Sequence, residues 1–198
     1  MRAGKTARRR ELRGKRRALA DAEHRGRSRR AAKSIARLPL FAAGARVAIY
    51  LPIDREADTA LLVAAARRRG VKIFVPVVSD MRRRRLRFYP LAGRMRRGAY
   101  GILVPIGTSR AVDARWLDLI VVPVVGVDAG GCRLGMGGGF YDRALAFRSA
   151  RRHWRGPRLI GLAFDCQRVA SVCAQPWDLR LDMLATETGL IRFARQPQ

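Results

Sequence analysis

Short apolar runs alternate with amphipathic stretches along most of the chain, and this alternation predicts strands separated by helices. Four runs dominated by aliphatic residues are typical of buried strands: residues 46–51, 71–78, 117–127 and 158–164. The most apolar of them, 117–127, is expected at the centre of a sheet, because a central parallel strand is buried on both faces.

A helix is predicted between the first two strands. Residues 57–70 have helical spacing, with Asp58 as the expected N-cap and Gly70 as the C-terminal stop. A strand, helix and strand of this size predict two parallel strands, because parallel neighbours need a long crossover connection.

The remaining segments continue the alternation. Residues 82–91 predict a charged turn followed by a strand, although the longer run 82–97 has the weakest pattern and is expected to be a mobile loop. A glycine-rich stretch precedes a helix that is expected to run to about Ala150, and residues 184–193 are a candidate last strand. This order predicts an α/β fold with three layers, α/β/α, around a mostly parallel central sheet.

The N-terminal segment predicts two very basic helices. Residues 5–38 contain few helix breakers, and Asp21 is the expected N-cap of a second helix whose apolar spacing ends before Pro39. We therefore expect a single domain over residues 1–198, made of a basic helical arm (1–38) and an α/β core (45–193).

Composition adds a strong positive charge to this picture. The chain carries 42 Lys and Arg against 15 Asp and Glu, a net charge of +27. Such a field attracts nucleotides, polyglutamates, nucleic acid or anionic membranes, but a genome rich in arginine codons gives the same excess, so the charge alone identifies no partner. The N-terminus lacks an apolar signal segment, no run is long enough to span a bilayer, and the cysteines form no CxxC pair. These features favour a soluble cytoplasmic protein.

The stretch "RLGMGGGFYDR" (133–143) is the strongest candidate for chemistry, because its four glycines fall within residues 135–139. A glycine loop between a strand and a helix can direct backbone N–H groups at a phosphate. The dinucleotide fingerprint fails at Phe140, and the P-loop pattern fails because no lysine and hydroxyl end the loop. A glycine-rich hairpin without a ligand is the alternative, but Arg133, Asp142 and Arg143 favour phosphate and metal chemistry.

Carboxylates are scarce, which makes the internal ones informative. Glu56 follows the first strand, where α/β sheets place ligands, and Asp142 is a candidate Mg²⁺ ligand, with Asp178 or Asp182 as a second. A surface salt bridge is the alternative for each of them.

Other polar residues have simpler expected roles. Asp118 is expected to cap or pair, Asp128 to lie in a turn, and His24 and His153 to be solvated in charged helices. No zinc spacing and no nucleophile elbow is present in the sequence.

Several ordered segments resemble one enzyme family. "RLGMGGGFYDR" resembles a G-x-G-x-G-[YF]-Y-D-R signature, and "YLPIDREADT" (50–59) resembles a Y-x-P…E-x-[DE]-T segment. Lys5 and Arg9 match a Lys-x-x-x-Arg pair, while "IGLAFDCQ" and "WDLRLDMLATETG" follow in the expected order. On these segments the chain resembles the 5-formyltetrahydrofolate cyclo-ligase family, also called 5,10-methenyltetrahydrofolate synthetases, over nearly its whole length.

The resemblance implies an ATP- and Mg²⁺-dependent ligase that cyclises 5-formyltetrahydrofolate to 5,10-methenyltetrahydrofolate and releases ADP and phosphate. It implies catalytic roles for Lys5 and Arg133 and metal binding by Asp142 and Asp178. The implied ATP-binding residues are Lys5, Arg9, Arg133, Leu134, Gly135, Met136, Gly137, Gly138, Gly139, Phe140 and Tyr141. The implied folate-binding residues are Leu51, Glu56, Met136, Gly137, Gly138, Gly139 and Phe140.

Some positions depart from the family pattern. Phe140 stands where the family often has tyrosine, and Cys173 and Trp177 replace a proline and a frequent histidine. These departures affect the expected substrate geometry rather than the reaction class.

The expected partners are small molecules. The substrate includes polyglutamylated forms of the folate, and we expect a monomer with no membrane or dedicated nucleic-acid partner. The arm is expected to be mobile until ATP binds. The alternative is a non-catalytic nucleic-acid-binding protein on the same fold, but aromatic residues are only 7% of the chain and do not interleave with the basic runs.

Overall fold

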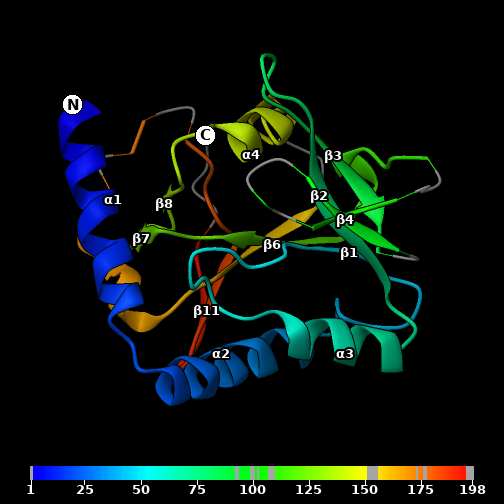
Figure 1. Ribbon diagram of the computed structural model, residues 1–198, viewed down its shortest axis with the longest axis horizontal. Helices are drawn as coiled ribbons and strands as arrows, with labels where there is room; N and C mark the ends of the chain where they lie inside the picture. Colours follow the sequence, from blue (N-terminus) through cyan, green and yellow to red (C-terminus); the bar gives the residue numbers. More distant parts are fainter. Residues whose placement is uncertain are drawn as a thin grey trace.

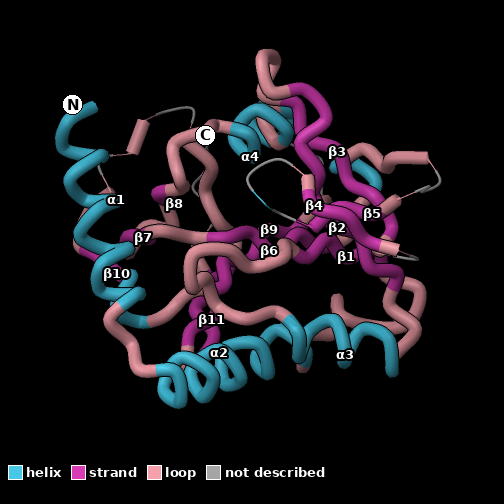
Figure 2. Tube along the Cα trace, in the orientation of Figure 1, coloured by secondary structure: helices cyan, strands magenta, loops and turns pink. Residues whose placement is uncertain are grey.

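A seven-stranded sheet forms the centre of the protein (Figures 1 and 2). The computed structural model describes residues 2–91, 94–98, 101, 103–106, 110–150, 156–172, 174–175 and 178–194. The strands of the sheet, in spatial order, are β12 (Gly189–Arg192), β11 (Met183–Thr186), β9 (Arg158–Leu162), β6 (Leu119–Pro123), β1 (Arg46–Ile49), β2 (Lys72–Asp80) and β3 (Arg85–Pro90).

The five inner strands are parallel, and the two edge strands, β12 and β3, run antiparallel to their neighbours. The mostly parallel sheet is thus confirmed, with β6 in the middle position. The unit β1, α3 (Ala60–Arg68), β2 is the expected parallel crossover. Gly70 follows the end of α3 with a φ of +68°, as expected for the residue that stops the helix.

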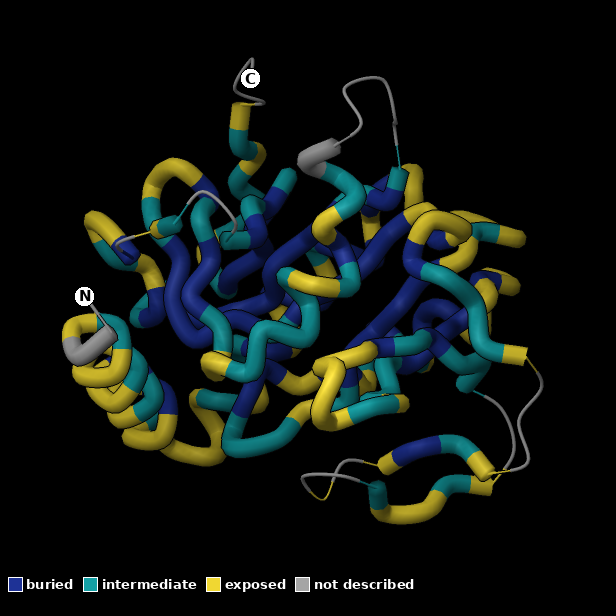
Figure 3. Tube along the Cα trace, turned by 90° about the horizontal axis from the view of Figure 1, so that it is seen from above, coloured by how far each residue is buried: buried dark blue, intermediate teal, exposed yellow. Residues whose placement is uncertain are grey.

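Helices cover one face of the sheet, and short elements cover the other. On the first face, α2 (Asp21–Ala36) and α3 pack Ala32, Ile35 and Leu62 against β1, β6 and β9. The opposite face is covered by the short helices α4 (Phe140–Ala144) and α5 (Phe147–Ala150) and by the 3₁₀ turn η2 (Ala114–Trp116). Figure 1 shows the sheet between these two layers, and Figure 3, seen from above, shows that the central strands are buried.

The N-terminal helix packs against a smaller sheet. It has the strand order β10 (Arg168–Val169), β7 (Gly126–Asp128), β8 (Arg133–Leu134), and the turn η3 (Asp165–Gln167) precedes β10. Helix α1 (Arg2–Arg17) packs Leu12 into this region so closely that a Cβ at Gly126 would lie 2.6 Å from the leucine Cδ1. Because β8 leads into the glycine loop, α1 lies beside that loop.

Two boundary predictions are wrong. The N-cap of α2 is Ala20, because Asp21 is the first helical residue and its side chain pairs with Arg55. The cap position of α3 is Thr59, although the Asp58 carboxylate still accepts a hydrogen bond from the Ala60 N–H at 2.8 Å.

The charged turn and strand expected at 82–91 are confirmed, whereas the mobile loop expected over 82–97 is wrong where the described residues form strands. Residues 85–90 form β3, because Leu86 and Phe88 alternate with polar residues and are buried against the core. Residues 95–97 form β4 (Met95–Arg97), which pairs with β5 (Leu103–Pro105).

The predicted strands at 117–127 and 184–193 are each divided in two. The first continues past β6 into β7, and the second is the hairpin β11–β12. Whether residues 1–38 are a separable arm stays a prediction, although α2 supplies part of the main core. No helix among the described residues has the length and apolar character needed to cross a bilayer.

Candidate active site

A cleft of about 1480 Å³ lies between α1, the glycine loop, the β2–β3 ribbon and the segments that follow β1 and β6. It is lined by every residue that the family resemblance assigned to ATP, folate or metal: Lys5, Arg9, Leu51, Glu56, Arg133, Leu134, residues 135–141, Asp142 and Asp178. The structure therefore brings together candidates from the N-terminus, the segment after the first strand, the loop and the C-terminal third. The role of each remains a proposal.

The glycine loop connects β8 to α4 and needs its glycines for two reasons. Gly137 and Gly139 have φ values of +98° and +68°, a backbone region that side-chain-bearing residues rarely adopt. Gly135 has no such strain, but a Cβ there would lie 2.7 Å from Nη1 of Arg133. The loop is thus packed directly against a guanidinium group.

Arg133 is a buried cation beneath this loop. Its side chain is only 6% exposed in the fold. Nη1 donates to the Pro123 carbonyl at 3.3 Å, and Nη2 donates to Oδ1 of Asp142 at 3.2 Å. The guanidinium also lies 5.6 Å from the ring centroid of Tyr141. Its Nε is buried and has no hydrogen-bond partner among the described residues, which leaves a donor for a bound group.

Helix α1 supplies cations on the other side of the loop. Nε of Arg9 donates to the Gly135 carbonyl at 2.8 Å, and its guanidinium lies against Gly137. Lys5, one helical turn earlier, forms an ion pair with Asp178. The loop therefore lies between the cations of α1 and Arg133, although it lacks the lysine of a P-loop.

Asp142 and Asp178 lie close together. The backbone N–H of Leu179, the residue after Asp178, donates to Oδ1 of Asp142 at 3.0 Å. Among the described residues, no group of three or more His, Cys, Asp or Glu side chains is arranged to hold a metal ion. The pair can therefore supply two carboxylates to a cation that takes its other ligands from a substrate or water.

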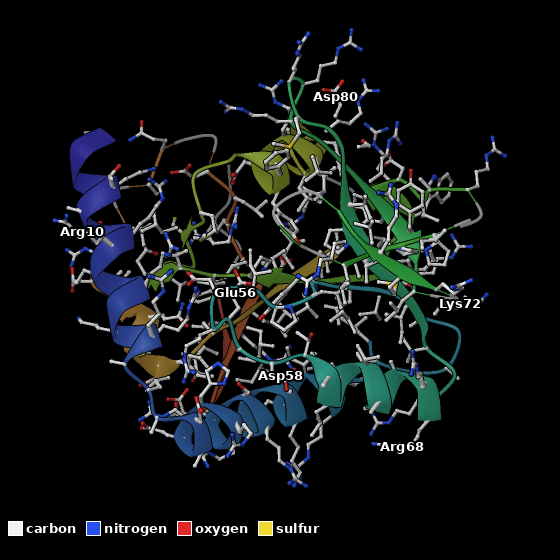
Figure 4. The ribbon with its side chains drawn as sticks, in the orientation of Figure 1. Arg10, Glu56, Asp58, Arg68, Lys72 and Asp80 are labelled. Atoms are coloured by element: carbon white, nitrogen blue, oxygen red, sulfur yellow. The ribbon has the colours of Figure 1, made fainter. Side chains whose placement is uncertain are left out.

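Glu56 is a buried carboxylate on the opposite side of the cleft. It is 5% exposed, and its Oε2 accepts a hydrogen bond from the Ile53 N–H at 3.2 Å. Burial raises the pKa of Glu56 to about 7, despite the opposing backbone hydrogen bond from Ile53 and the positive charge of Arg16. Figure 4 shows Glu56 in the interior, between α1 and the sheet, whereas Arg10, Arg68 and Lys72 point outward.

Comparison with known proteins places this arrangement in a family. The model of the 5-formyltetrahydrofolate cyclo-ligase family matches residues 1–187. The chain belongs to this family.

Curated relatives and solved structures agree with that assignment. The 5-formyltetrahydrofolate cyclo-ligase of Escherichia coli is 30% identical over 180 residues, which cover 88% of this chain and 96% of the relative. The enzyme of the same name from Haemophilus influenzae is 31% identical over 68% of this chain and 72% of its own length. The solved structure of Aquifex aeolicus 5,10-methenyltetrahydrofolate synthetase has 28% identity and a TM-score of 0.82, with coverage of 98% of this chain and 95% of its own.

Part of this cyclo-ligase cleft was not predicted from the sequence. The β2–β3 ribbon supplies an apolar wall that includes Pro76, Val78 and Leu86, and it also supplies Arg84. The alternation of apolar residues and arginine in 84–88 was the available signal, but a strand pattern does not tell which cleft its face will line.

Three other site predictions have clear outcomes. Asp182 does not line the cleft, because it binds Arg148 and the Leu159 N–H, so it is not a candidate metal ligand beside Asp178. Asp118 accepts from the Arg46 N–H and Asp128 closes a turn through Gly130 and Cys132, as expected.

The prediction of a solvated His24 is wrong. The ring is half-buried, its Nε2 lies 3.1 Å from the Arg55 carbonyl, and it meets Phe164 edge to face at a centroid distance of 5.1 Å. Helical spacing alone did not reveal that this face of α2 packs behind the Glu56 segment. His153, Cys173 and Trp177 lie outside the described residues.

Proposed function

We propose that this protein converts 5-formyltetrahydrofolate to 5,10-methenyltetrahydrofolate, with ATP going to ADP and phosphate. Family membership supports the reaction. The observation that carries the assignment to this cleft is the glycine loop held between Arg9 and Arg133, with the buried Glu56 opposite it. One cleft thus offers a cationic region and an apolar region with a single carboxylate.

The nucleotide would bind along the loop. Lys5, Arg9 and Arg133 would contact phosphate oxygens, and the backbone from Leu134 to Tyr141 would line the triphosphate. A buried guanidinium with an unpartnered Nε supports this placement, because an anion would supply the missing acceptor.

Magnesium would bind at Asp142 and Asp178. Both carboxylates are now paired with cations, Arg133 and Lys5, which a triphosphate would attract instead. Mg²⁺ is commonly bound by one or two carboxylates together with phosphate oxygens and water, so a two-carboxylate site fits this ion. When bound, it would neutralise charge on the transferring phosphoryl group.

The folate would bind at the apolar end. Leu51, Ile53 and Phe140 line the cleft and would hold the pterin ring, with the loop residues 136–140 along its edge. Glu56, in its ionised form, would accept hydrogen bonds from pterin N–H groups.

The chemistry needs positioning more than a covalent nucleophile. The N5-formyl group is an amide, so its carbon is a poor electrophile and its oxygen a poor leaving group. Transfer of the γ-phosphoryl group to that oxygen corrects both deficiencies, after which N10 attacks the carbon and phosphate departs. Fixed cations such as Lys5 and Arg133 would stabilise the charge that develops during transfer.

The cations at the edge of the cleft would suit a polyglutamylated tail. Arg84, Arg96 and Arg143 line the cleft in addition to the predicted set. Affinity for the folate is expected to rise with the number of glutamates and to fall with salt. Equal affinity for mono- and pentaglutamate at low and high salt would contradict this part of the proposal.

The deciding experiment is a turnover assay. Purified protein is mixed with 5-formyltetrahydrofolate, Mg²⁺ and ATP, and methenyltetrahydrofolate is followed by its ultraviolet absorbance. An ATP-dependent rise supports the proposal, and its absence from well-folded protein rejects it. The expectation of a cytoplasmic monomer is tested separately, by sedimentation of the protein and by fractionation of cells.

A further inference from the structure

The segment that carries Glu56 is a tight turn with unfavourable backbone geometry. The Glu56 N–H donates to the Ile53 carbonyl at 2.9 Å, so residues 53–56 close a turn. Its two central residues, Asp54 and Arg55, have φ values of +48° and +58°. Positive φ at two successive non-glycine residues costs free energy and persists only where the surroundings impose it.

Helix α1 imposes that geometry through Asp54. Arg13 Nε donates to Oδ2 at 2.8 Å, and Arg17 Nε donates to Oδ1 at 2.6 Å. Arg16 Nη2 donates both to the Asp54 backbone carbonyl at 2.7 Å and to Oδ2 at 3.0 Å. Burial acts to raise the pKa of Asp54, but these hydrogen bonds outweigh it and hold the pKa below its usual value.

Arg16 is an unusual residue for a simple helix anchor. Its side chain is 0% exposed, and Nε and Nη1 are buried without hydrogen-bond partners among the described residues. A buried, incompletely satisfied guanidinium is unfavourable for stability. The hydrogen bonds that Arg16 does make are to Asp54 in the turn, and one of them is to the Asp54 backbone carbonyl. We therefore infer that the unfavourable burial of Arg16 is offset by its stabilisation of the turn.

The turn transfers this restraint to Glu56. The Ile53 N–H donates to the Glu56 carboxylate, so the side chain folds back over the turn. Arg55 is held as well, because its guanidinium binds the Asp21 carboxylate and the Leu19 carbonyl. Among the described residues, Ile53 and Glu56 line the cleft, whereas Arg16 and Asp54 do not. Arg16 and Asp54 therefore act on a ligand indirectly, through the turn, through α1 or through the effect of their charges on Glu56.

We propose that Arg16 and Asp54 are positioning residues for Glu56. The contact between them, supported by Arg13 and Arg17, holds the 53–56 turn so that the Glu56 carboxylate faces the folate. This inference rests on the proposed function for the role of Glu56. A purely structural role, in which the arginines only attach α1 to the core, is the competing explanation.

The test uses Asp54→Asn, because asparagine tolerates positive φ while it removes the charge that the arginines bind. The KM for 5-formyltetrahydrofolate is expected to rise about tenfold, with the KM for ATP changed less than about threefold. In a Glu56→Gln background, adding Asp54→Asn should change the folate KM less than about twofold, because the group being positioned is gone. Lys15→Gln, on the exposed side of the same helix, is the matched control and should behave as wild type.

Two patterns of raised KM values overturn the inference. One is a folate KM that rises by the same factor with and without the Glu56→Gln change. The other is an equal rise in both KM values, which a loosened α1 would produce because Lys5 and Arg9 lie on it. If Asp54→Asn does not fold, as judged by circular dichroism, Arg16→Lys carries the same test, because lysine keeps the charge but cannot bridge two acceptors in the same way.

Wild-type turnover separates this inference from the proposed function. An inactive wild type rejects the proposed function, and direct binding of 5-formyltetrahydrofolate by calorimetry then tests the same set of variants. A folate affinity that Asp54→Asn leaves unchanged, or the absence of folate binding to the wild type, rejects the positioning role. An active wild type with unchanged folate KM in both Asp54→Asn and Arg16→Lys rejects the positioning role alone.

Discussion

Glu56 combines burial with a proposed role, folate binding, that requires charge. A carboxylate away from water favours its protonated form, which is why the pKa lies at about 7. Hydrogen bonds from pterin N–H groups favour the ionised form. The free protein and the folate complex therefore prefer different protonation states near neutral pH.

The pH dependence of Glu56 is predicted with a definite sign. The folded-state pKa of about 7 lies above the reference value of 4.5, so the folded protein holds a proton that the unfolded chain releases between these values. The contribution of Glu56 to the free energy of unfolding is fully present below about pH 4.5 and is lost as the pH rises through about 7. The total loss is on the order of 3 kcal/mol. Urea unfolding from pH 5 to 8 should show this decline in wild type, and Glu56→Gln should lack it.

Folate binding should have the opposite pH dependence. The folate KM of wild type is expected to fall as the pH rises through about 7, because the ionised carboxylate is the acceptor. Glu56→Gln should have a higher and flatter KM over this range. Identical profiles for the two proteins would contradict the role of the carboxylate.

Arg133→Ala tests the nucleotide placement. Loss of a fixed cation at the transferring group is expected to lower kcat/KM about 100-fold or more. The melting temperature should fall as well, because the buried side chain also contacts Asp142 and the Pro123 carbonyl, so kcat/KM is compared on protein shown to be folded by circular dichroism. Arg168→Ala is a suitable control, because its partner Asp165 lies outside the cleft. Full activity of Arg133→Ala would mean that the nucleotide binds elsewhere.

At this scale, the sequence could predict that Lys5, Arg133 and Glu56 belong to one site, because they lie in recognisable segments, and the structure places all three at one cleft. Their chemical roles stay predictions. The contact of Arg16 with Asp54 joins residues 38 positions apart and depends on positive φ values. Neither property leaves a periodic signal in the sequence.

The glycine loop is the element on which both halves of the cleft depend. Its backbone passes between Arg9 and Arg133, so small displacements of the loop alter both sets of contacts. The loop has little room for side chains.

Gly135→Ala is predicted to impair nucleotide binding selectively. The new Cβ would lie 2.7 Å from Arg133 Nη1, so the loop or the guanidinium must move. The KM for ATP is expected to rise about tenfold, as steady-state kinetics would show, with a small change in melting temperature. Gly26→Ala is the matched control, because its Cβ would make only an ordinary 3.6 Å contact with an arginine in α2. Equal kinetics for the two variants would argue against a tight loop.

Helix α1 is expected to respond to nucleotide in its first half. Lys5 and Arg9 hold that half by polar contacts, whereas Leu12 and Arg16 are fully buried in the second half. Hydrogen exchange should therefore slow over residues 2–10 when an ATP analogue and Mg²⁺ are added, with little change over 11–17. Uniform protection of the whole helix in both states would contradict ordering by nucleotide.

Element boundaries show why the sequence pattern was only partly sufficient. The parallel strands and α3 were predicted because aliphatic runs and helical spacing dominate there. The strand β3 was predicted, but β4 was obscured by arginine, since exposed strands tolerate charge and lose the apolar signal. The contribution of either strand to the cleft was not predicted.

The charge of the whole molecule is unevenly compensated. The basic residues of α1 include several paired with Glu11, Asp54 or Asp178. By contrast, six exposed cations of α2 and α3 take part in no ion pair among the described residues: Arg25, Arg29, Arg30, Lys33, Arg67 and Arg68. The face covered by α2 and α3 therefore carries a group of basic side chains that no neighbouring carboxylate pairs with among the described residues.

Repulsion on this scale predicts a stabilising effect of simple salt. The melting temperature should rise by several degrees between about 20 mM and about 500 mM sodium chloride, because the Debye length shrinks from about 20 Å to about 4 Å. Differential scanning calorimetry measures this directly, with sucrose as a control for effects of added solute. A melting temperature that falls with sodium chloride would mean that the ion pairs outweigh the repulsion.

The attachment of α1 at both ends of the cleft has a thermodynamic consequence. One helix carries Lys5 and Arg9 beside the glycine loop and Arg16 on the Glu56 turn. If nucleotide binding shifts α1, the folate affinity changes by some factor, and the folate must then change the nucleotide affinity by the same factor. Calorimetric titration of each ligand in the absence and presence of the other, with an ATP analogue that does not react, gives both factors and closes the cycle.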